Sequence, residues 1–263
     1  MAEQKKVLRL KSQAKEIRKE ILTMIHAAQS GHPGGSLSAA DMMTALYFDE
    51  LRLNPENPQW EERDRFVLSK GHACPVLYTC LALRGFFPKE ELVTLRCPGV
   101  DISTGSLGQG LSAAVGMALC AKRDQKSFRV FCMVGDGESN EGQIWEAVEV
   151  AAKYNLDNLI ILLDRNRLQN DGTCEEIMPN GNLVDKFTAF GCQVWEIDGH
   201  DMETILDTLD EIHADHSGKP KCVVAHTVKG KGVFFMENAV EWHGMAPNDD
   251  QFARALKDIE EGF

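Results

Sequence analysis

The stretch with the clearest chemical potential is residues 134–142, Val-Gly-Asp-Gly-Glu-Ser-Asn-Glu-Gly, in which a carboxylate stands between two glycines. It follows an apolar run and precedes a helical pattern. Glycines at such a junction usually let a phosphate group approach the N-terminus of the helix. Asp136 would repel that anion unless a cation lay between the two. The stretch therefore predicts a phosphate site that includes a metal ion.

Asn166 is the second candidate ligand, thirty residues after Asp136. Strand patterns at 128–134 and 158–164 are separated by one helical pattern at 141–154, which indicates a β-α-β unit. Both strands bring their last residues to the carboxyl edge, where open α/β sheets bind ligands. We therefore expect Asp136 and Asn166 to be neighbours. Carboxylate and amide oxygens suit Mg²⁺ or another hard divalent cation.

The Gly-Asp-Gly sequence is open to other interpretations. Gly-Asp-Gly is also a common turn, so the tripeptide alone leaves both interpretations open. A dinucleotide fingerprint would need glycine at position 140, which is Asn140. No G-x-x-x-x-G-K-[ST] phosphate loop occurs in the chain. The placement of Asn166 after the next strand favours the cation site.

The elements that would position these residues alternate regularly along the chain. Apolar strand patterns occur at 65–69, 128–134, 158–164, 192–197 and 221–227. Helical patterns occur at 6–29, 111–123, 141–154, 182–190 and 201–215. Another occurs at 39–51, with Ser38 as the expected N-cap, and a further one follows residues 71–73 and ends at residue 83. Continuous apolar strands between helices predict an α/β fold, a mainly parallel sheet with helices on both faces and an N-terminal helical extension. No linker divides the chain, so we expect one domain, residues 1–263.

Composition limits the class of protein. The chain has 263 residues, of which 43% are hydrophobic and 26% charged, as in proteins with a sizeable core. Its net charge of −12 argues against binding to nucleic acid or a membrane surface, whose phosphates it would repel. No signal peptide or membrane-spanning run is found, so a cytoplasmic location is expected. The eight cysteines form no CxxC pair, which favours reduced thiols over disulfides or zinc ligands.

Several segments together resemble the transketolase family. The Gly-Asp-Gly with its distant asparagine is similar to the thiamine-diphosphate motif of that family. The other matching segments are SGHPG, DRFVLSKGH, TGSLGQG and EWHG, at residues 30–34, 64–72, 104–110 and 241–244. The resemblance extends over nearly the whole chain but only the N-terminal half of a full-length transketolase. It is strongest to the N-terminal subunit of split transketolases, a diphosphate-binding domain.

The resemblance implies a thiamine diphosphate and Mg²⁺ site with particular residues. The implied metal ligands are Asp136, Asn166 and the carbonyl of Leu168, while Gly137 donates to the diphosphate and the cofactor rings are lined by Gly105, Ser106 and Leu107. His72 and His243 match histidines beside the diphosphate and the reactive carbon, and His32 matches one that faces the sugar. Histidine suits ketol transfer because it titrates near neutral pH. The remaining histidines are expected to be structural or on the surface: His26, His200, His213, His216 and His226.

Four charged residues near these motifs are open to two interpretations. Glu141 and Glu146 would favourably meet the N-terminal end of a helix. In the family, matching glutamates lie between paired active sites, so we assign a functional role to Glu141 and treat Glu146 as a solvated residue. Lys229 and Lys231 could meet a sugar phosphate, but a flexible basic loop is the simpler interpretation.

The implied reaction is transfer of a two-carbon ketol unit from a ketose phosphate to an aldose phosphate, as in the pentose phosphate pathway. In the family, the glutamate that activates the cofactor belongs to the next domain, so activity is expected only with a C-terminal partner subunit, in an α2β2 assembly. The connection at 95–103 is shorter than in the family and lacks a substrate-contacting histidine, which leaves sugar specificity open. The alternatives are a deoxyxylulose-phosphate synthase, the α-subunit of a 2-oxo acid dehydrogenase, or a non-catalytic module that keeps the fold.

Overall fold

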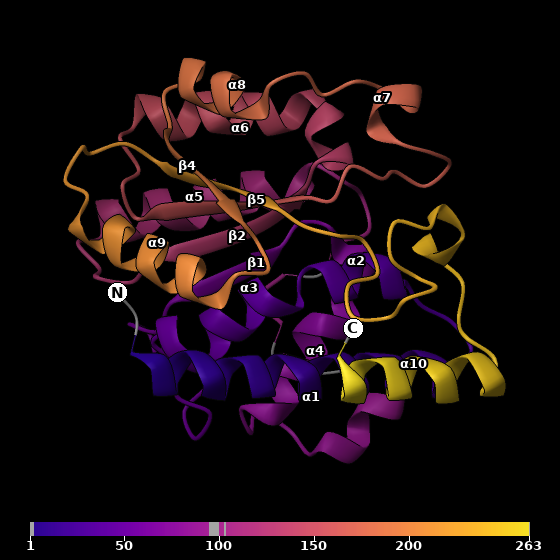
Figure 1. The fold of residues 1–263 in the computed structure, drawn as a ribbon. Helices are drawn as coiled ribbons and strands as arrows, with labels where there is room; N and C mark the ends of the chain where they lie inside the picture. The colour runs from indigo at the N-terminus through magenta and orange to yellow at the C-terminus, as the bar shows by residue number, and fades with distance from the viewer. Residues whose placement is uncertain (1–2, 95–99, 103, 263) are drawn as a thin grey trace.

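The computed structural model describes residues 3–94, 100–102 and 104–262. These residues form a five-stranded parallel sheet in the order β1-β2-β3-β5-β4 (Figure 1). The strands are β1 (Arg65–Leu68), β2 (Val130–Gly135), β3 (Leu159–Arg165), β4 (Gln193–Asp198) and β5 (Lys221–His226). The five predicted strands and their parallel arrangement are therefore confirmed. Most of the shortened connection, residues 95–99 and 103, lies outside the described residues.

Helices cover both faces of the sheet (Figure 1). One face carries α5 (Gln109–Arg123), α6 (Gly142–Lys153) and α8 (Leu183–Ala189). The other face carries α1 (Gln4–Ala28), α3 (Ala40–Ala45), α4 (Cys74–Leu83) and α9 (Met202–Ala214), with α10 (Asp249–Glu261) beside α1. Shorter elements are α2 (Pro33–Ser38), η1 (Leu46–Glu50), η2 (Gly71–Ala73), η3 (Lys89–Thr94), η4 (Gly137–Asn140), α7 (Cys174–Ile177) and η5 (Val240–His243).

Alternate residues of each central strand enter two separate cores. In β2, Phe131 and Met133 point into the core under α1, α3, α4 and α9, whereas Cys132 and Val134 point into the core under α5 and α6. Because both faces are covered, the strand appears in the sequence as one continuous apolar run. This explains why the strands could be located from the sequence without any polar alternation.

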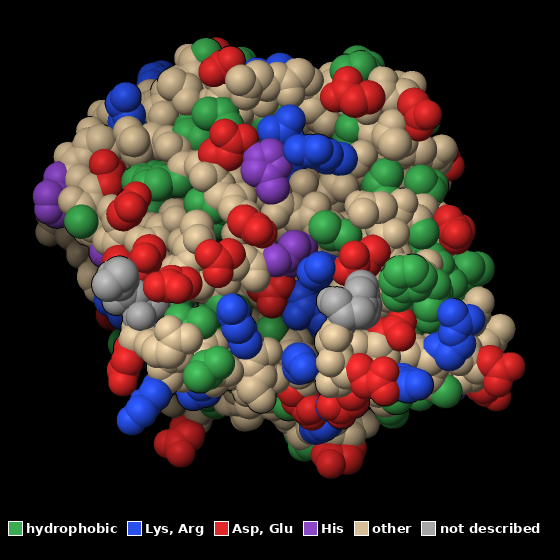
Figure 2. Space-filling view, viewed as in Figure 1, with side chains coloured by type: hydrophobic (Ala, Val, Ile, Leu, Met, Phe, Trp, Pro, Cys, Tyr) green, Lys and Arg blue, Asp and Glu red, His purple; other side chains and the backbone are tan. Residues whose placement is uncertain are grey.

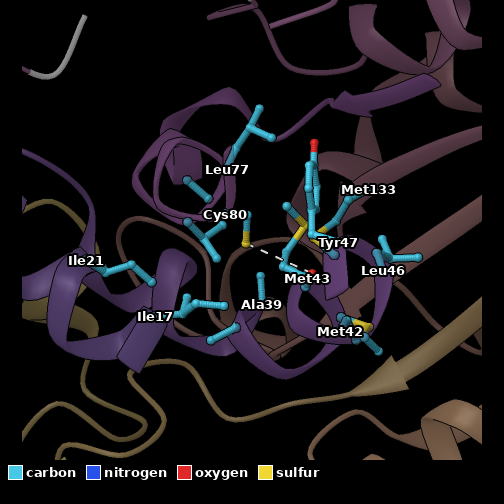
Figure 3. Packing of buried hydrophobic residues seen from close by; sticks show 14 of the residues in the cluster. Ile17, Ile21, Ala39, Met42, Met43, Leu46, Tyr47, Leu77, Cys80 and Met133 are labelled. Carbon is cyan, nitrogen blue, oxygen red and sulfur yellow. Dashed lines mark hydrogen bonds between the residues drawn. The ribbon is translucent and has the colours of Figure 1, made fainter. Parts of the chain in front are cut away.

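The core beneath the sheet joins the N-terminal helix to the rest of the fold (Figure 3). Ile17 and Ile21 of α1 are fully buried against α3 and α4. The Cys80 thiol of α4 lies 4.0 Å from the carbonyl oxygen of Met43 in α3. Burying each large apolar side chain contributes about 1.5–3 kcal/mol, so the predicted helical extension is an integral layer of the fold.

The region after α1 differs from the sequence prediction. Pro33, within the SGHPG segment, begins the short helix α2, which no predicted helix includes. Proline suits this position because it lacks only an N–H that the first helical position cannot use. Ser38 does not cap the next helix. Its hydroxyl instead donates to the Gly35 carbonyl (3.2 Å) and to Asp164 Oδ2 (2.7 Å). The predicted helix 39–51 consists of α3 followed by the π-helical turn η1.

Surface charge and thiol chemistry agree with the sequence. Acidic side chains spread over most of the face shown in Figure 2, with basic side chains between them. The seven cysteines within the described residues are all unpaired. Among the described helices, none combines the length and apolarity that a membrane span requires.

Helix α5 offers a test of its close packing against the residue that follows β1. A Cβ at Gly110 would lie 2.6 Å from Ser69 Cα, whereas one at Gly116 of the same helix would meet nothing within 4 Å. We expect Gly110→Ala to lower the free energy of unfolding by about 1–3 kcal/mol, because backbone must move to admit the methyl group. Gly116→Ala, the matched control, should raise it by up to about 1 kcal/mol. Urea denaturation measures both, and equal effects would contradict the packing described.

Candidate functional site

Strands β2 and β3 end side by side, and Asp136 connects their ends. Gly135 of β2 pairs with Asp164 of β3. Asp136 Oδ1 accepts a hydrogen bond from the Gly137 amide (2.8 Å), and Oδ2 accepts one from the Arg167 amide (2.5 Å). Burial raises the pKa of Asp136 to about 6, although the Arg167 amide opposes this shift. The carboxylate is therefore buried at the tip of β2 and faces the loop after β3.

Asn166 and the Leu168 carbonyl come from that loop. Asn166 Oδ1 accepts from the Leu168 amide (3.1 Å), and its Nδ2 donates to Asp164 Oδ2 (3.3 Å). Together with Asp136, both residues line a cavity of about 310 Å³. The structure thus brings the three predicted metal ligands to one cavity.

The donor set of this cavity fits a hard cation. Carboxylate, amide and carbonyl oxygens are the ligands that Mg²⁺ takes from proteins, together with water and phosphate oxygens. Among the described residues, those of this cavity included, no group of three or more His, Cys, Asp or Glu side chains could hold a metal. A cation at the cavity would therefore depend on mixed oxygen donors and on oxygens supplied by its ligand.

Three histidines from three separate loops meet beside the cavity. His32 precedes α2, His72 lies in η2 and His243 ends η5. The ring centroids are 5.3 Å apart for His32 and His72, 5.5 Å for His32 and His243, and 5.3 Å for His72 and His243. The structure therefore places all three predicted histidines in one cluster.

The ionisation of these histidines differs from the prediction. Burial, reinforced by Lys70, lowers the pKa of His72 to about 3. Burial and Lys229 lower the pKa of His243 to about 4, and the same two causes lower the pKa of His32. The expectation that they titrate near neutral pH is therefore wrong for the chain as it stands. At pH 7 each ring is a neutral imidazole, which accepts a hydrogen bond at one nitrogen and donates at the other.

Lys229, for which the sequence left a contact with a sugar phosphate open, lines the cavity. Its side chain is buried rather than part of a flexible basic loop. The ammonium donates to the carbonyls of Leu168 (3.2 Å) and Gln169 (2.9 Å) and to His243 Nδ1 (2.6 Å). Burial, with Lys70 nearby, lowers the pKa of Lys229 to about 8, so it remains mostly protonated at pH 7. Lys231 instead pairs with Glu237 (3.1 Å).

A second lysine, Lys70, also lines the cavity and forms a buried ion pair with Asp164. Its ammonium also donates to the Gly35 carbonyl (2.8 Å). Asp164 accepts further hydrogen bonds from Ser38 (2.7 Å) and Thr227. Burial alone would raise the pKa of Asp164, but Lys70 outweighs it and holds that pKa below its usual value. A charged residue inside the apolar pattern 158–164 was the available signal for this pair.

The remaining predicted residues divide between the cavity and its surroundings. Three of them line the cavity: Leu107, Gly137 and Glu141. Gly105 and Ser106 are exposed and are not among the lining residues. Glu141 precedes α6 without a side-chain cap, and Glu146 is exposed on that helix.

Glu138, which was not predicted, connects three of the loops around the cavity. One carboxylate oxygen accepts from the Ser69 hydroxyl and the Gly108 amide (2.8 Å), and the other accepts from the Gly135 amide (3.0 Å). The side chain is only 3% exposed, and burial raises its pKa. One carboxylate thus fixes loops that lie far apart in the sequence.

The sheet and its edge define the chain as an open α/β protein with a ligand site at the carboxyl ends of parallel strands. A family model described as the thiamine diphosphate binding domain of transketolase matches residues 10–260. The chain therefore belongs to the transketolase family, and the predicted resemblance and fold class are confirmed.

Individual relatives agree with this assignment. The chain is 41% identical to one of the subunits of the apulose-4-phosphate transketolase of Phocaeicola vulgatus, over 96% of this chain and 94% of the relative. It is 44% identical to the 6-deoxy-6-sulfo-D-fructose transketolase subunit SqwG of a Clostridium species, over 95% and 96%. The crystal structure of Campylobacter jejuni transketolase superposes with a TM-score of 0.90 at 34% identity, over 95% of this chain but 42% of that one.

The role of Glu138 can be tested by removing its charge. In Glu138→Gln the amide nitrogen cannot accept, so a buried donor such as the Gly135 amide loses its partner. We expect the free energy of unfolding to fall by about 1–3 kcal/mol. Glu149→Gln, an exposed position on α6, is the matched control and should have little effect. Chemical denaturation compares the two, and a neutral Glu138→Gln would contradict the bridging role.

Proposed function

We propose that this chain is the thiamine diphosphate- and Mg²⁺-binding subunit of a split transketolase. The enzyme would move a two-carbon ketol unit from a ketose phosphate to an aldose phosphate. The observation that supports this most strongly is one cavity lined by Asp136, Asn166 and Leu168 beside a cluster of histidines, in a chain of this family. Residues 1–263 would act as a single diphosphate-binding domain.

The cation would rest on Asp136, Asn166 and the Leu168 carbonyl, and the diphosphate on Gly137 and the Lys229 ammonium. A larger cavity of about 710 Å³ is also lined by the three proposed cation ligands. None of the three clustered histidines lines that cavity. We therefore place the cofactor in the smaller cavity, which His72 and His243 line.

The neutral histidines would handle the hydroxyl protons of the sugar. When bound, thiamine diphosphate supplies an electron sink for cleavage and formation of the carbon–carbon bond. Lys229 donates to His243 Nδ1, so the proton of that ring lies on Nε2 and is available to an oxygen of the substrate. His32 and His72 adjoin this ring and would hold neighbouring hydroxyl groups.

A second polypeptide would complete the site. Relatives named as transketolase subunits match over nearly their whole length, whereas the Campylobacter transketolase is covered over 42%. Leu107 and Met178, which line the cavity, are 38% and 57% exposed, as expected of a rim that a partner covers. We propose an α2β2 assembly in which Glu141 lies near the neighbouring site.

The metal site is tested by Asp136→Ala. Without the carboxylate, the remaining neutral oxygens hold the cation weakly, so we expect Mg²⁺-dependent binding of thiamine diphosphate to be lost. Calorimetry measures the affinity, and circular dichroism checks the fold. Asp171→Ala, an exposed position in the loop after β3, is the control and should bind as the wild type does. Unchanged affinity in Asp136→Ala would remove the basis for this site.

Ketol transfer is tested by mixing the chain with a candidate C-terminal transketolase subunit. We expect products from a ketose phosphate and an aldose phosphate only when both subunits, thiamine diphosphate and Mg²⁺ are present. Chromatography of the sugar phosphates measures the products, and pyruvate replaces the ketose in a parallel reaction. Turnover of pyruvate alone, or no turnover by a well-formed complex, would overturn the transketolase assignment.

A further inference from the structure

The loop that carries Lys229 contains two glycines with positive φ angles. Gly230 and Gly232 have φ angles of +82° and +93°, in the region that glycine enters freely. A segment with two such residues loses much conformational entropy when it is ordered. The loop has hydrogen bonds of its own, such as that from the Lys231 amide to the Val228 carbonyl (3.1 Å), and contacts from outside the loop add to these in holding the Lys229 ammonium in its buried position.

Two side chains hold the loop on either side of Lys229. His200 Nε2 accepts a hydrogen bond from the Val228 amide (2.8 Å), one residue before the lysine. Arg18 Nε donates to the Lys231 carbonyl (3.1 Å), two residues after it. The first side chain follows β4 and the second belongs to α1, so they connect the loop to two segments that lie far apart in the sequence.

Asp41 holds both of these side chains. Its Oδ1 accepts from Arg18 Nη1 (3.1 Å), and its Oδ2 accepts from Arg18 Nη2 (2.5 Å) and lies 2.7 Å from His200 Nδ1. Because His200 Nε2 accepts the Val228 amide, its proton lies on Nδ1 and is donated to Asp41. Asp41 and Arg18 are each 7% exposed. The carboxylate therefore sets both the tautomer of the imidazole and the orientation of the guanidinium.

We propose that Asp41 is a positioning residue for cofactor binding, which places the Lys229 ammonium at the cavity by way of His200 and Arg18. The inference rests on the proposed function, since the cofactor is the anion that Lys229 would meet. Asp41 does not line the cofactor cavity and instead borders a separate cleft with Arg18 and His200. It would thus act on binding without touching the ligand.

The charge of Asp41 is what the network requires. Burial would raise its pKa, but Arg18 and His200 outweigh burial and hold that pKa well below its usual range. An asparagine of the same shape can accept at one atom only. Asp41→Asn would therefore leave at least one N–H of the guanidinium facing an amide nitrogen in place of an acceptor, and would weaken the hold on the loop.

A double-mutant cycle tests the route through Lys229. Calorimetry measures thiamine diphosphate binding with Mg²⁺ in the wild type, Asp41→Asn, Lys229→Met and the double variant, each as the full chain with its partner subunit. We expect Asp41→Asn to weaken binding about tenfold in the wild type but less than about twofold in the Lys229→Met background. An equal loss in both backgrounds, or no loss in either, would overturn the inference.

Asp64→Asn is the matched control for a buried carboxylate. Asp64 is 1% exposed and pairs with Arg52 and Arg129 at the opposite, amino end of the sheet. We expect this variant to lose stability as Asp41→Asn does but to keep the wild-type affinity. An equal loss of affinity in Asp64→Asn would show that any buried carboxylate has the effect, and would overturn the inference.

Variants of His200 test the same route if Asp41→Asn does not fold. His200→Ala removes the acceptor for the Val228 amide and should weaken binding about tenfold. His200→Gln can accept from that amide and donate to Asp41, so it should largely restore binding. Equal affinities of His200→Ala and His200→Gln for the cofactor would overturn the inference. A wild-type complex that binds no cofactor would instead overturn the proposed function, and the inference with it.

Discussion

The carboxyl edge of this protein depends on one buried ion pair, Lys70 with Asp164. Taking both charges out of water costs several kcal/mol per ion unless each finds further partners. The partners here are the Gly35 carbonyl for Lys70, and the hydroxyls of Ser38 and Thr227 for Asp164. Gly35 and Ser38 belong to α2, and Thr227 directly follows β5. The pair therefore stabilises the fold only if these segments converge, and their convergence shapes the cavity.

The same charges decide how the site treats protons and anions. The chain carries a net charge of −12, so an anionic ligand must be attracted by a local arrangement of cations. Lys229 supplies a buried ammonium at the cavity, and Lys70 adds to the potential that keeps His72 neutral. Sites that combine buried lysines with neutral imidazoles can bind phosphates while their histidines still exchange protons. The electrostatics of the cavity thus follow from packing as much as from residue type.

The sequence predicted what depends on periodicity and topology, and it failed where distant contacts decide. Continuous apolar runs located all five strands, and the β-α-β connection placed Asp136 beside Asn166. The Lys70–Asp164 pair joins residues 94 positions apart, so the charge of Asp164 in its apolar run was visible but no local pattern indicated Lys70 as its partner. Lys229 lies in a glycine-rich segment that resembles a flexible loop, and its order comes from contacts with distant residues such as Arg18. The lowered histidine pKa values likewise require burial, which the sequence does not reveal.

In the proposed site, the arrangement of charges would make the binding of the cation and of the diphosphate depend on each other. The Leu168 carbonyl, a proposed ligand of the cation, already accepts from the Lys229 ammonium (3.2 Å). A divalent cation beside that ammonium is opposed by Coulomb repulsion, and Asp136 is the one carboxylate among the proposed ligands. A diphosphate between them reverses the balance, because its oxygens bind the cation and accept from the lysine. Each ligand therefore lowers the cost of holding the other, which makes the carboxylate of Asp136 compatible with a phosphate site.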